Sequence, residues 1–244
     1  MSGPLLDVAA VGKRFGGFVA LSDITLAVPR GERLGLIGPN GSGKSTLVNC
    51  ICGTLRNDAG SVTFNGHRLD GLPAHRRTRL GLARSFQLPR PFHTMTLAEN
   101  VQVPILYAAR SRGHRGPGSG LRDGAEALLD MVGLGGKAHQ RPADLTQIEM
   151  RKLELAKAMA SDPQMLIADE VMAGLSHREV DEILAMLLKL NESGITFIMI
   201  EHIMRAVLAF SQRLVVLVAG RKIADGPPHE VIRDDDVVAA YLGR

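Results

Sequence analysis

The sequence predicts an α/β fold with a P-loop NTPase core built on a mixed parallel sheet, an N-terminal antiparallel β-subdomain and an inserted α-helical subdomain. Within its 244 residues, the first third alternates short apolar segments with Gly or Pro turns. The middle third has helical spacing, and the last third alternates continuous apolar segments with an amphipathic one. Hydrophobic residues make up 45% and charged residues 22%, with a net charge of +4, which is an ordinary globular composition.

An antiparallel sheet is expected in the first third of the chain. Its apolar segments are short and separated by turn residues such as Gly16-Gly17: Leu5–Val11, Asp23–Val28, Arg33–Ile37 and Ser61–Phe64. Asn65-Gly66 follows the last of these, and this pair tolerates the positive φ that a two-residue hairpin turn demands.

The remaining two thirds predict helices followed by a βαβ arrangement. A helical pattern runs from about residue 96 to 160, interrupted by Ser111–Gly120, whose Gly, Pro and Arg content predicts an exposed loop. Three later segments are almost continuously apolar, as in a parallel sheet buried on both faces: Gln164–Ala168, Thr196–Ile200 and Arg213–Val218. Between the first two, one helix face is traced by Val180, Ile183, Leu184 and Leu187.

A phosphate-binding motif, G-x-x-x-x-G-K-[ST], occupies residues 38–45 directly after the apolar segment Leu34–Ile37. It opens a predicted helix from Lys44 to Cys52, closed by Gly53. The glycines let backbone N–H groups surround phosphates, and the helix N-terminus adds partial positive charge. Lys44 supplies a point charge during catalysis, and the Ser45 hydroxyl suits Mg²⁺. Contacts to ATP are expected from Gly38, Pro39, Asn40, Gly41, Ser42, Gly43, Lys44, Ser45 and Thr46.

Two adjacent acids follow the apolar segment Met165–Ala168. Asp169 is expected to reach the metal, and Glu170 to polarise the water that attacks the γ-phosphate. Adjacent acids at a strand end also suit a helix N-cap or a solvated turn. The phosphate-binding motif favours the catalytic interpretation, in which Mg²⁺ and ATP are the cofactors.

With these motifs, nearly the whole chain resembles an ATP-binding-cassette (ABC) nucleotide-binding domain. The resemblance implies that Gln87, in the segment Arg84–Gln87, contacts Mg²⁺ and the attacking water. His202 matches the family's switch histidine, which holds the γ-phosphate. Phe15 matches the aromatic residue that stacks on adenine, and Val19 then packs on the base or ribose edge. As alternatives, His202 would be a surface polar residue and Phe15 a core residue.

The same resemblance implies a single domain over residues 1–244. The core and antiparallel subdomain would comprise residues 1–87 and 164–244, and the helical subdomain with the signature loop residues 88–163. Short segments resemble one subgroup, the importers of branched-chain amino acids and related solutes: Lys13–Ala20, Arg84–Gln87, Met95–Val101, Asp169–Leu175 and Ala239–Gly243.

That subgroup implies a set of partners. The chain would energise a bacterial importer beside two transmembrane permease subunits, a second ABC ATPase subunit that is a copy or a paralogue, and a periplasmic solute-binding protein. The permeases would dock between the core and the helical subdomain, near residues 87–92. No apolar run approaches the ~20 residues needed to span a bilayer, and no signal peptide is expected. The expected location is therefore the cytoplasmic face of the inner membrane, with no nucleic acid as partner.

The signature loop departs from the family pattern Leu-Ser-Gly-Gly-Gln and reads Leu145-Thr146-Gln147-Ile148-Glu149. In the family this loop binds the nucleotide of the opposite subunit. Thr146 keeps a hydroxyl for that contact in trans, whereas Gln147 and Ile148 are expected to add bulk where Gly permits close approach. In a heterodimer, the site on this chain's own P-loop would then be the more active one. A homodimer in which Thr146 and the backbone suffice is the alternative.

Other classes of P-loop protein fit less well. A GTPase would need a guanine-specific N-K-x-D motif, which the sequence lacks, and a kinase would need an acceptor site and a lid. A soluble cassette ATPase acting on DNA or ribosomes would usually carry coiled coils or two cassettes. An exporter motor for lipid or lipopolysaccharide, from the same family, is the main alternative.

Overall fold

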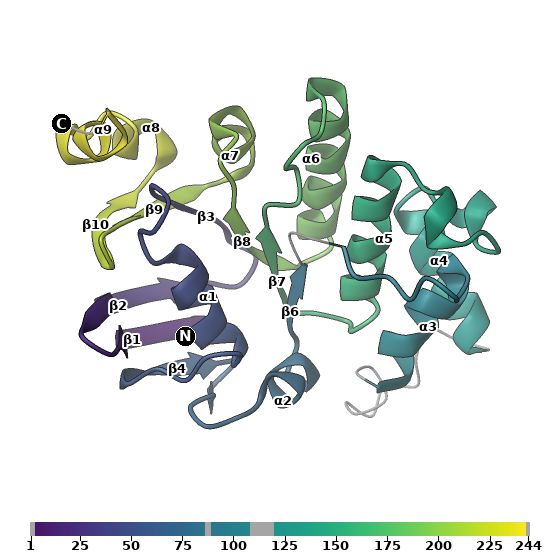
Figure 1. Cartoon of the computed structure of the whole chain (residues 1–244), viewed down its shortest axis with the longest axis horizontal. Coiled ribbons are helices and arrows are strands. Elements are labelled where there is room, and N and C mark those ends of the chain that lie inside the picture. The colour runs from purple at the N-terminus through teal and green to yellow at the C-terminus, as the bar shows by residue number, and fades with distance from the viewer. Residues whose placement is uncertain (1–2, 86–88, 108–119, 243–244) are drawn as a thin grey trace.

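Two sheets and a group of helices make up the computed structural model, which describes residues 3–85, 89–107 and 120–242 (Figure 1). A four-stranded antiparallel sheet has the order β2-β1-β4-β5, and a six-stranded sheet has the order β10-β9-β3-β8-β7-β6. The antiparallel sheet lies at one end of the molecule and helices α3, α4 and α5 at the other, with the six-stranded sheet between them. This arrangement confirms the predicted fold class.

The antiparallel sheet contains three of the four segments predicted for it, each longer at one end than predicted. The prediction is wrong for Arg33–Ile37, which forms β3 in the six-stranded sheet and pairs in parallel with β8 and β9. Its sequence is apolar on both faces, which suits a central parallel strand.

The strands of the antiparallel sheet are β1 (Leu6–Phe15), β2 (Phe18–Val28), β4 (Ala59–Phe64) and β5 (His67–Arg68). β1 and β2 form a hairpin through Gly16-Gly17, with Phe15 opposite Phe18 at its tip. The predicted turn at Asn65-Gly66 joins β4 to β5, and both of its residues have positive φ (50° and 76°), as the turn requires.

The six-stranded sheet is parallel except at one edge. Its strands are β3 (Arg33–Ile37), β6 (Leu82–Ser85), β7 (Met165–Asp169), β8 (Thr196–Ile200), β9 (Arg213–Val218) and β10 (Arg221–Gly226). Within this sheet, β10 runs antiparallel to its neighbour, β9. The carboxyl ends of β3, β7 and β8 meet at one edge, where a ligand site is expected in an open α/β sheet.

Helices cover this sheet and form the far end of the molecule. They are α1 (Lys44–Cys52), α2 (Ala74–Arg79), α3 (Leu97–Tyr107), α4 (Leu121–Met131), α5 (Gln147–Met159), α6 (His177–Glu192), α7 (Met204–Phe210), α8 (Pro228–Val231) and α9 (Asp235–Leu242), with 3-10 turns at Gly135–Lys137 and Pro142–Asp144. The predicted helical middle is confirmed as α3 to α5. The predicted loop Ser111–Gly120 lies outside the described residues except for Gly120, which caps α4. No described helix is long and apolar enough to cross a membrane.

Alternate residues of the parallel strands point into different cores. Met165, Ile167 and Ile198 pack with α1 and the antiparallel sheet. Their neighbours in sequence, including Leu166 and Phe197, pack with α5 and α6 on the other face. The period of two places apolar side chains on both faces, which explains the continuous apolar segments in the sequence.

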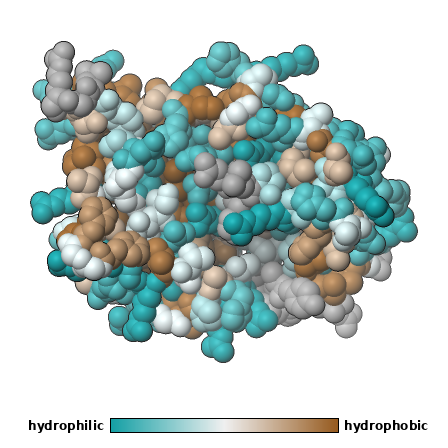
Figure 2. Space-filling model, in the orientation of Figure 1, coloured by the Kyte–Doolittle hydropathy of each residue, from teal (hydrophilic) through white to brown (hydrophobic). Residues whose placement is uncertain are grey.

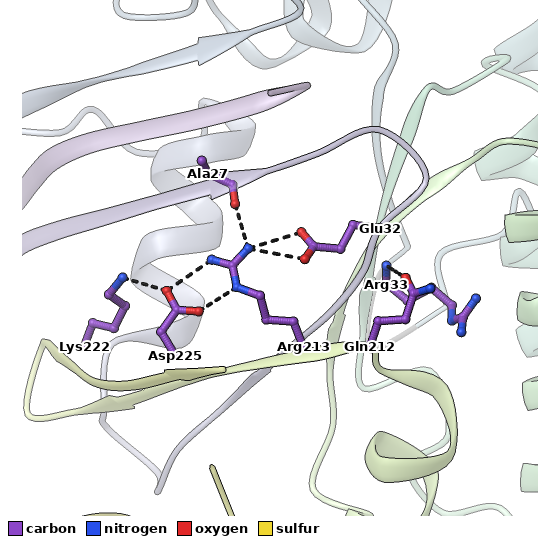
Figure 3. Close-up of polar contacts among 7 residues, drawn as sticks. All are labelled: Ala27, Glu32, Arg33, Gln212, Arg213, Lys222 and Asp225. Carbon is purple, nitrogen blue, oxygen red and sulfur yellow. Dashed lines mark hydrogen bonds and ion pairs between the residues drawn. The ribbon is translucent and has the colours of Figure 1, made fainter. Parts of the chain in front are cut away.

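An ion network joins the antiparallel sheet to the parallel one. Figure 3 shows Arg213 of β9 between Asp225 of β10 and Glu32, the residue before β3. The guanidinium makes two bonds to Asp225 (2.6 and 3.1 Å), reaches Glu32 at 3.3 Å and donates to the Ala27 carbonyl of β2 at 2.9 Å. Lys222 also bonds Asp225, at 2.7 Å. Strands β2, β9 and β10 are thereby held together.

Candidate functional site

The phosphate-binding loop leaves β3 and enters α1 with a backbone that requires glycine at two positions. Gly38 has φ +148°, and a Cβ there would lie 2.1 Å from the Leu217 carbonyl oxygen. Gly43 has φ +107°, and a Cβ would lie 2.9 Å from the Ala20 carbonyl oxygen. Residues 38–45 thus form a tight loop at the N-terminus of α1, where unpaired N–H groups favour an anion.

Lys44 is buried at the start of α1, and its side chain turns back over the loop. Its ammonium group donates to the carbonyls of Gly38 (2.6 Å) and Pro39 (3.0 Å) and lies 3.5 Å from the Ser42 hydroxyl. Burial lowers the pKa of Lys44, while the nearby carboxylates of Glu170 and Asp169 act in the opposite direction. A positive charge is therefore held in the loop, and the adjacent Ser45 is exposed.

Three predicted site residues lie together at the carboxyl ends of β7 and β8. Asp169 is the last residue of β7 and pairs in register with Ile200 of β8. Glu170 follows in the left-handed region (φ 49°), with its N–H bonded to the Ile200 carbonyl at 2.9 Å. His202 Nε2 lies 3.2 Å from Glu170 Oε1. The strand order thus brings together groups that are far apart in the sequence.

Arg84 is a neighbour of Asp169 that the sequence reasoning did not assign to the site. On β6, its guanidinium donates from Nη2 to Asp169 Oδ2 at 2.5 Å and from Nη1 to Asn49 Oδ1 of α1 at 2.7 Å. The side chains of Arg84 and Asp169 are 16% and 10% exposed. Arg84 is opposite Ile167 in the register of two parallel strands, a relation that requires knowledge of the strand order.

Glu201 is a second functional candidate that the sequence reasoning missed. This residue is 3% exposed, and its carboxylate accepts a hydrogen bond from the Met172 N–H at 2.8 Å. Arg151 of α5 lies nearby and donates to the Ala173 carbonyl at 3.3 Å. Burial raises the pKa of Glu201 to about 7, against the backbone N–H groups of Met172 and His202, which lower it. Glu201 thus connects the turn after Glu170 to the strand end that carries His202.

The tip of the β1–β2 hairpin exposes an apolar surface. Phe15 is 47% exposed, Phe18 64% and Val19 37%. Figure 2 shows this hydrophobic area at the left edge of the molecule, over the hairpin. The Lys13 ammonium lies 5.5 Å from the centre of the Phe15 ring. An exposed ring beside a cation offers a stacking surface for a planar base.

The signature loop forms the N-terminal cap of α5. The Glu149 N–H is bonded to the Thr146 hydroxyl at 3.4 Å, and Glu149 Oε2 accepts from the Thr146 N–H at 3.0 Å, which completes a capping box. Lys137 pairs with Glu149 at 2.6 Å. The bond from Lys137, followed by that from Thr146, lowers the pKa of Glu149. A carboxylate therefore occupies the end of the helix that would otherwise attract an anion.

One detail of the predicted signature loop is wrong. The sequence predicts that Ile148 adds bulk at the exposed loop, but its side chain is 9% exposed and packs into the helical core. It points inward because it lies in the first turn of a helix whose apolar face covers that core. Gln147 is exposed, and its amide donates to the Ala173 carbonyl at 3.3 Å. Ser176 donates its hydroxyl to Glu179 in the first turn of α6.

The donor set suits a magnesium ion held partly by a nucleotide. Among the described residues, no group of three or more His, Cys, Asp or Glu side chains could hold a metal. Mg²⁺ in nucleotide sites uses one or two carboxylates with phosphate oxygens and water, so a dense cluster is not required. Asp169 offers a carboxylate with Oδ2 bound to Arg84, and the Ser45 hydroxyl belongs to an exposed residue. Gln87, the third predicted metal ligand, lies outside the described residues.

Comparison with family models and with curated sequences shows likeness along the whole chain. Residues 21–173 match the ABC transporter model, and residues 221–244 match the branched-chain amino acid ATP-binding cassette transporter model. The chain is 36% identical to the high-affinity branched-chain amino acid transport ATP-binding protein LivG of Salmonella typhimurium, over 100% of this chain and 99% of that protein. It is 34% identical to BraF of Pseudomonas aeruginosa, with the same description and the same coverage.

Solved structures share the fold over nearly the whole chain. The ADP conformation of MJ1267, an ATP-binding cassette of an ABC transporter, superposes with a TM-score of 0.88 at 31% identity, covering 98% of this chain and 99% of that one. The dimeric post-hydrolysis state of the ATP-binding cassette MJ0796, bound to ADP and Pi, gives 0.79 at 26% identity, covering 91% and 98%.

Proposed function

Because the chain belongs to the ABC transporter ATP-binding family, we propose that it hydrolyses ATP to energise a membrane importer of branched-chain amino acids or related small solutes. The observation that carries this proposal is the phosphate-binding loop 38–45 with Asp169, Glu170 and His202 at the neighbouring strand ends. The curated relatives are described as branched-chain amino acid transport proteins, and residues 221–244 match the model of that subgroup.

In this function, each part of the loop has a separate role toward ATP. The N–H groups from Asn40 to Thr46 bind the phosphates, assisted by the N-terminus of α1. Lys44 exchanges its bonds to the loop carbonyls for bonds to the terminal phosphates, where its charge is needed during transfer. Phe15 stacks on the adenine and Val19 packs against its edge, since both side chains are exposed at the hairpin tip.

Mg²⁺ would be held by Ser45, Asp169 and Gln87. When bound, the ion draws negative charge from the phosphate oxygens. Glu170 orients a water molecule and takes its proton as the oxygen attacks the γ-phosphorus. The bond to the β-phosphate oxygen then breaks, which gives ADP and phosphate. His202, already within reach of Glu170, holds the γ-phosphate and the base in one place.

Replacing Glu170 by Gln tests this assignment. The amide keeps the size of the side chain but cannot take the proton, so we expect ATP binding to persist while turnover falls by about 10²- to 10⁴-fold. Binding is measured by equilibrium titration with Mg·ATP and turnover by phosphate release. Glu230→Gln, which changes an exposed carboxylate of α8 that has no assigned role toward ATP, is the matched control and should behave as wild type. Steady-state hydrolysis retained in Glu170→Gln would contradict the base assignment.

A groove supports the proposed contact with two permease subunits. A cavity of about 380 Å³ is lined by residues of α2, β6, α3 and α5, together with Arg90 and Phe92. Phe92 is 44% exposed there, so an apolar side chain is available to a partner.

We place the chain on the cytoplasmic face of the membrane, with a solute-binding protein on the opposite side. Residues 88–163 would act as the helical subdomain that moves against the core formed by 1–87 and 164–244.

The signature loop bears on the nature of the second ATPase subunit. Thr146 would approach the nucleotide of the partner, but the Glu149 carboxylate adds negative charge at the same helix end. Two copies of this chain would place the Glu149 carboxylate, paired with Lys137 at 2.6 Å, at both nucleotide sites, where it occupies the helix N-terminus that would otherwise bind a phosphate. A paralogous cassette with a glycine-containing signature loop would complete the site on this chain's own P-loop. We therefore propose a heterodimer with two unequal sites.

A further inference from the structure

Arg84 lies directly behind the proposed metal carboxylate. It is the third residue of β6, opposite Ile167 and two positions before the level of Asp169 on the adjacent strand β7. Its guanidinium bonds Asp169 Oδ2 at 2.5 Å and Asn49 Oδ1 at 2.7 Å. Both side chains of the ion pair are largely buried, at 16% and 10% exposure, so water screens their attraction only weakly.

The partner on α1 places this guanidinium beneath the phosphate-binding loop. Asn49 is four residues after Ser45 in the same helix, so the two side chains lie on one face, one turn apart. Arg84 therefore connects the helix that carries Ser45 to the strand end that carries Asp169. These are the two described residues proposed to hold the metal.

The ion pair has two physical consequences at the site. A planar guanidinium that donates to Oδ2 restricts the orientation of the Asp169 carboxylate. It also supplies positive charge that reduces the repulsion between Asp169 and an incoming triphosphate before the cation is in place. Lys44 is another nearby cation, and its ammonium group is bound to the loop carbonyls.

We propose that Arg84 is a positioning residue that orients the Asp169 carboxylate and compensates its charge, so that nucleotide and metal bind in either order. The proposal rests on the ATP-binding function proposed above. It assigns Arg84 no contact with ATP, and its effect beyond the long-range attraction of one positive charge passes through Asp169.

A double-mutant cycle on nucleotide affinity tests this role independently of catalysis. Arg84→Met, Asp169→Asn and the double variant are titrated with ATP in EDTA and again with Mg²⁺. Arg84→Met alone should weaken metal-free ATP binding by roughly tenfold, because the carboxylate charge is left uncompensated. The same change should weaken binding less in the Asp169→Asn background. The attraction of the guanidinium for the phosphates is lost in both backgrounds, but only a carboxylate released from Arg84 can turn toward the phosphates and repel them. With Mg²⁺ the loss should be smaller, because the cation replaces part of the missing charge.

Matched variants separate charge compensation from general damage to the fold. Asn49→Ala removes the other partner of the guanidinium without changing a charge, so its ATP affinity should stay near wild type. Arg84→Lys keeps the charge and should retain most of the affinity; if Arg84→Met does not fold, the cycle is run with Arg84→Gln. The proposal would be overturned if Arg84→Met caused the same loss of affinity with and without the Asp169→Asn change. A wild-type chain that fails to bind ATP would instead defeat the proposed function.

Discussion

Phe15 holds its ring at the hairpin tip, where nearly half of the side chain is exposed. If it stacks on adenine, Phe15→Ala should weaken ATP binding by about 1–3 kcal/mol, roughly 5- to 150-fold, with little loss of stability. The matched control is Phe18→Ala, since Phe18 pairs with Phe15 in the register of the same hairpin and is more exposed. Titration with Mg·ATP measures both. An equal effect of the two changes would argue against stacking by Phe15.

Glu201 links folding stability to pH. Burial raises the pKa of Glu201 to about 7 from an ordinary value of 4.5, with the Glu170 charge acting in the same direction and Arg151 against it. Between these two values, the folded chain keeps a proton that the unfolded chain has lost. This contribution to stability is complete below about pH 4.5 and disappears as the pH rises to about 7.

Glu201→Gln should remove that pH dependence. The amide oxygen can still accept from the Met172 N–H, but it does not ionise. Between pH 4.5 and 8, we expect the wild type to lose on the order of 2–3 kcal/mol of unfolding free energy more than the variant. Urea denaturation at a series of pH values gives the comparison. If the unfolding free energies of the two proteins changed with pH by the same amount, Glu201 would not be the source of the pH dependence.

Sequence reasoning found the residues whose chemistry is marked by their neighbours along the chain. Lys44 and Ser45 lie in a motif, and Asp169 follows an apolar strand, so their placement could be predicted. Arg84 and Glu201 could not, because their partners are set by the order and register of β6, β7 and β8. Glu201 also precedes a histidine in the sequence, a position that gives no sign of its burial.

At the scale of secondary-structure elements, Arg213 connects strands from both sheets. Arg213→Met would leave the carboxylates of Glu32 and Asp225 without their main partner, so we expect a loss of about 1–3 kcal/mol in unfolding free energy. Arg205→Met is the control, because Arg205 and Asp181 form a pair in which both side chains are more than half exposed. That pair should contribute less than about 1 kcal/mol. Urea denaturation at neutral pH measures the difference.

The same substitution should change the response to acid. Burial alone would raise the pKa of Asp225, but its bonds to Arg213 and Lys222 hold that pKa below the ordinary 3.8. Its contribution to stability is therefore present above about pH 3.8 and is lost as the pH falls further. The difference in unfolding free energy between the wild type and Arg213→Met should become smaller below this pH. If that difference did not change with pH, the loss of unfolding free energy would come from packing of the arginine side chain instead.

The boundaries of helices and strands are predictable where turn or capping residues coincide with the ends of a hydrophobic pattern. Helix α1 begins at Lys44 and ends before Gly53, as expected, and β8 and β9 match their predicted bounds. Strands β1 and β2 extend several residues beyond the apolar segments, because the hairpin continues through polar residues such as Lys13. Strand β10 lies outside the sequence prediction, since its edge position does not require an apolar sequence.

At the scale of the whole molecule, the complete P-loop and the altered signature loop would contribute to two different nucleotide sites in a pair of ATPase subunits. The loop 38–45, Glu170 and His202 form one proposed half-site. The end of α5 would serve a nucleotide bound by another subunit. Gln147 and the Glu149 carboxylate both lie there, whereas the neighbouring isoleucine is turned into the core. The partner would therefore supply an intact signature loop to the nucleotide on this chain's P-loop. This chain would supply an altered signature loop to the nucleotide on the partner's P-loop.

This asymmetry predicts unequal effects of the same mutation in the two ATPase subunits. In the complete transporter, Glu170→Gln should abolish nearly all solute-stimulated hydrolysis, because it removes the base from the site that faces an intact signature. The corresponding Glu→Gln change in the partner cassette should leave most of the turnover, because that site faces Thr146–Glu149. Phosphate release in reconstituted membranes measures both. Equal losses would support two equivalent sites.

Variants of the signature loop test the cause of the asymmetry. Gln147→Gly with Glu149→Gln removes the bulk and the charge while keeping a capping-box residue at position 149. In a Glu170→Gln background, which slows hydrolysis, this pair should increase ATP-dependent dimerisation of the isolated chain, measured by sedimentation. Ile148 is left unchanged, because Ile148→Gly would empty a packed position and destabilise the helical core by about 2–5 kcal/mol. If the dimer is already stable with ATP before these changes, Glu149 does not close the helix end to phosphate, and two copies of this chain can form the ATPase pair.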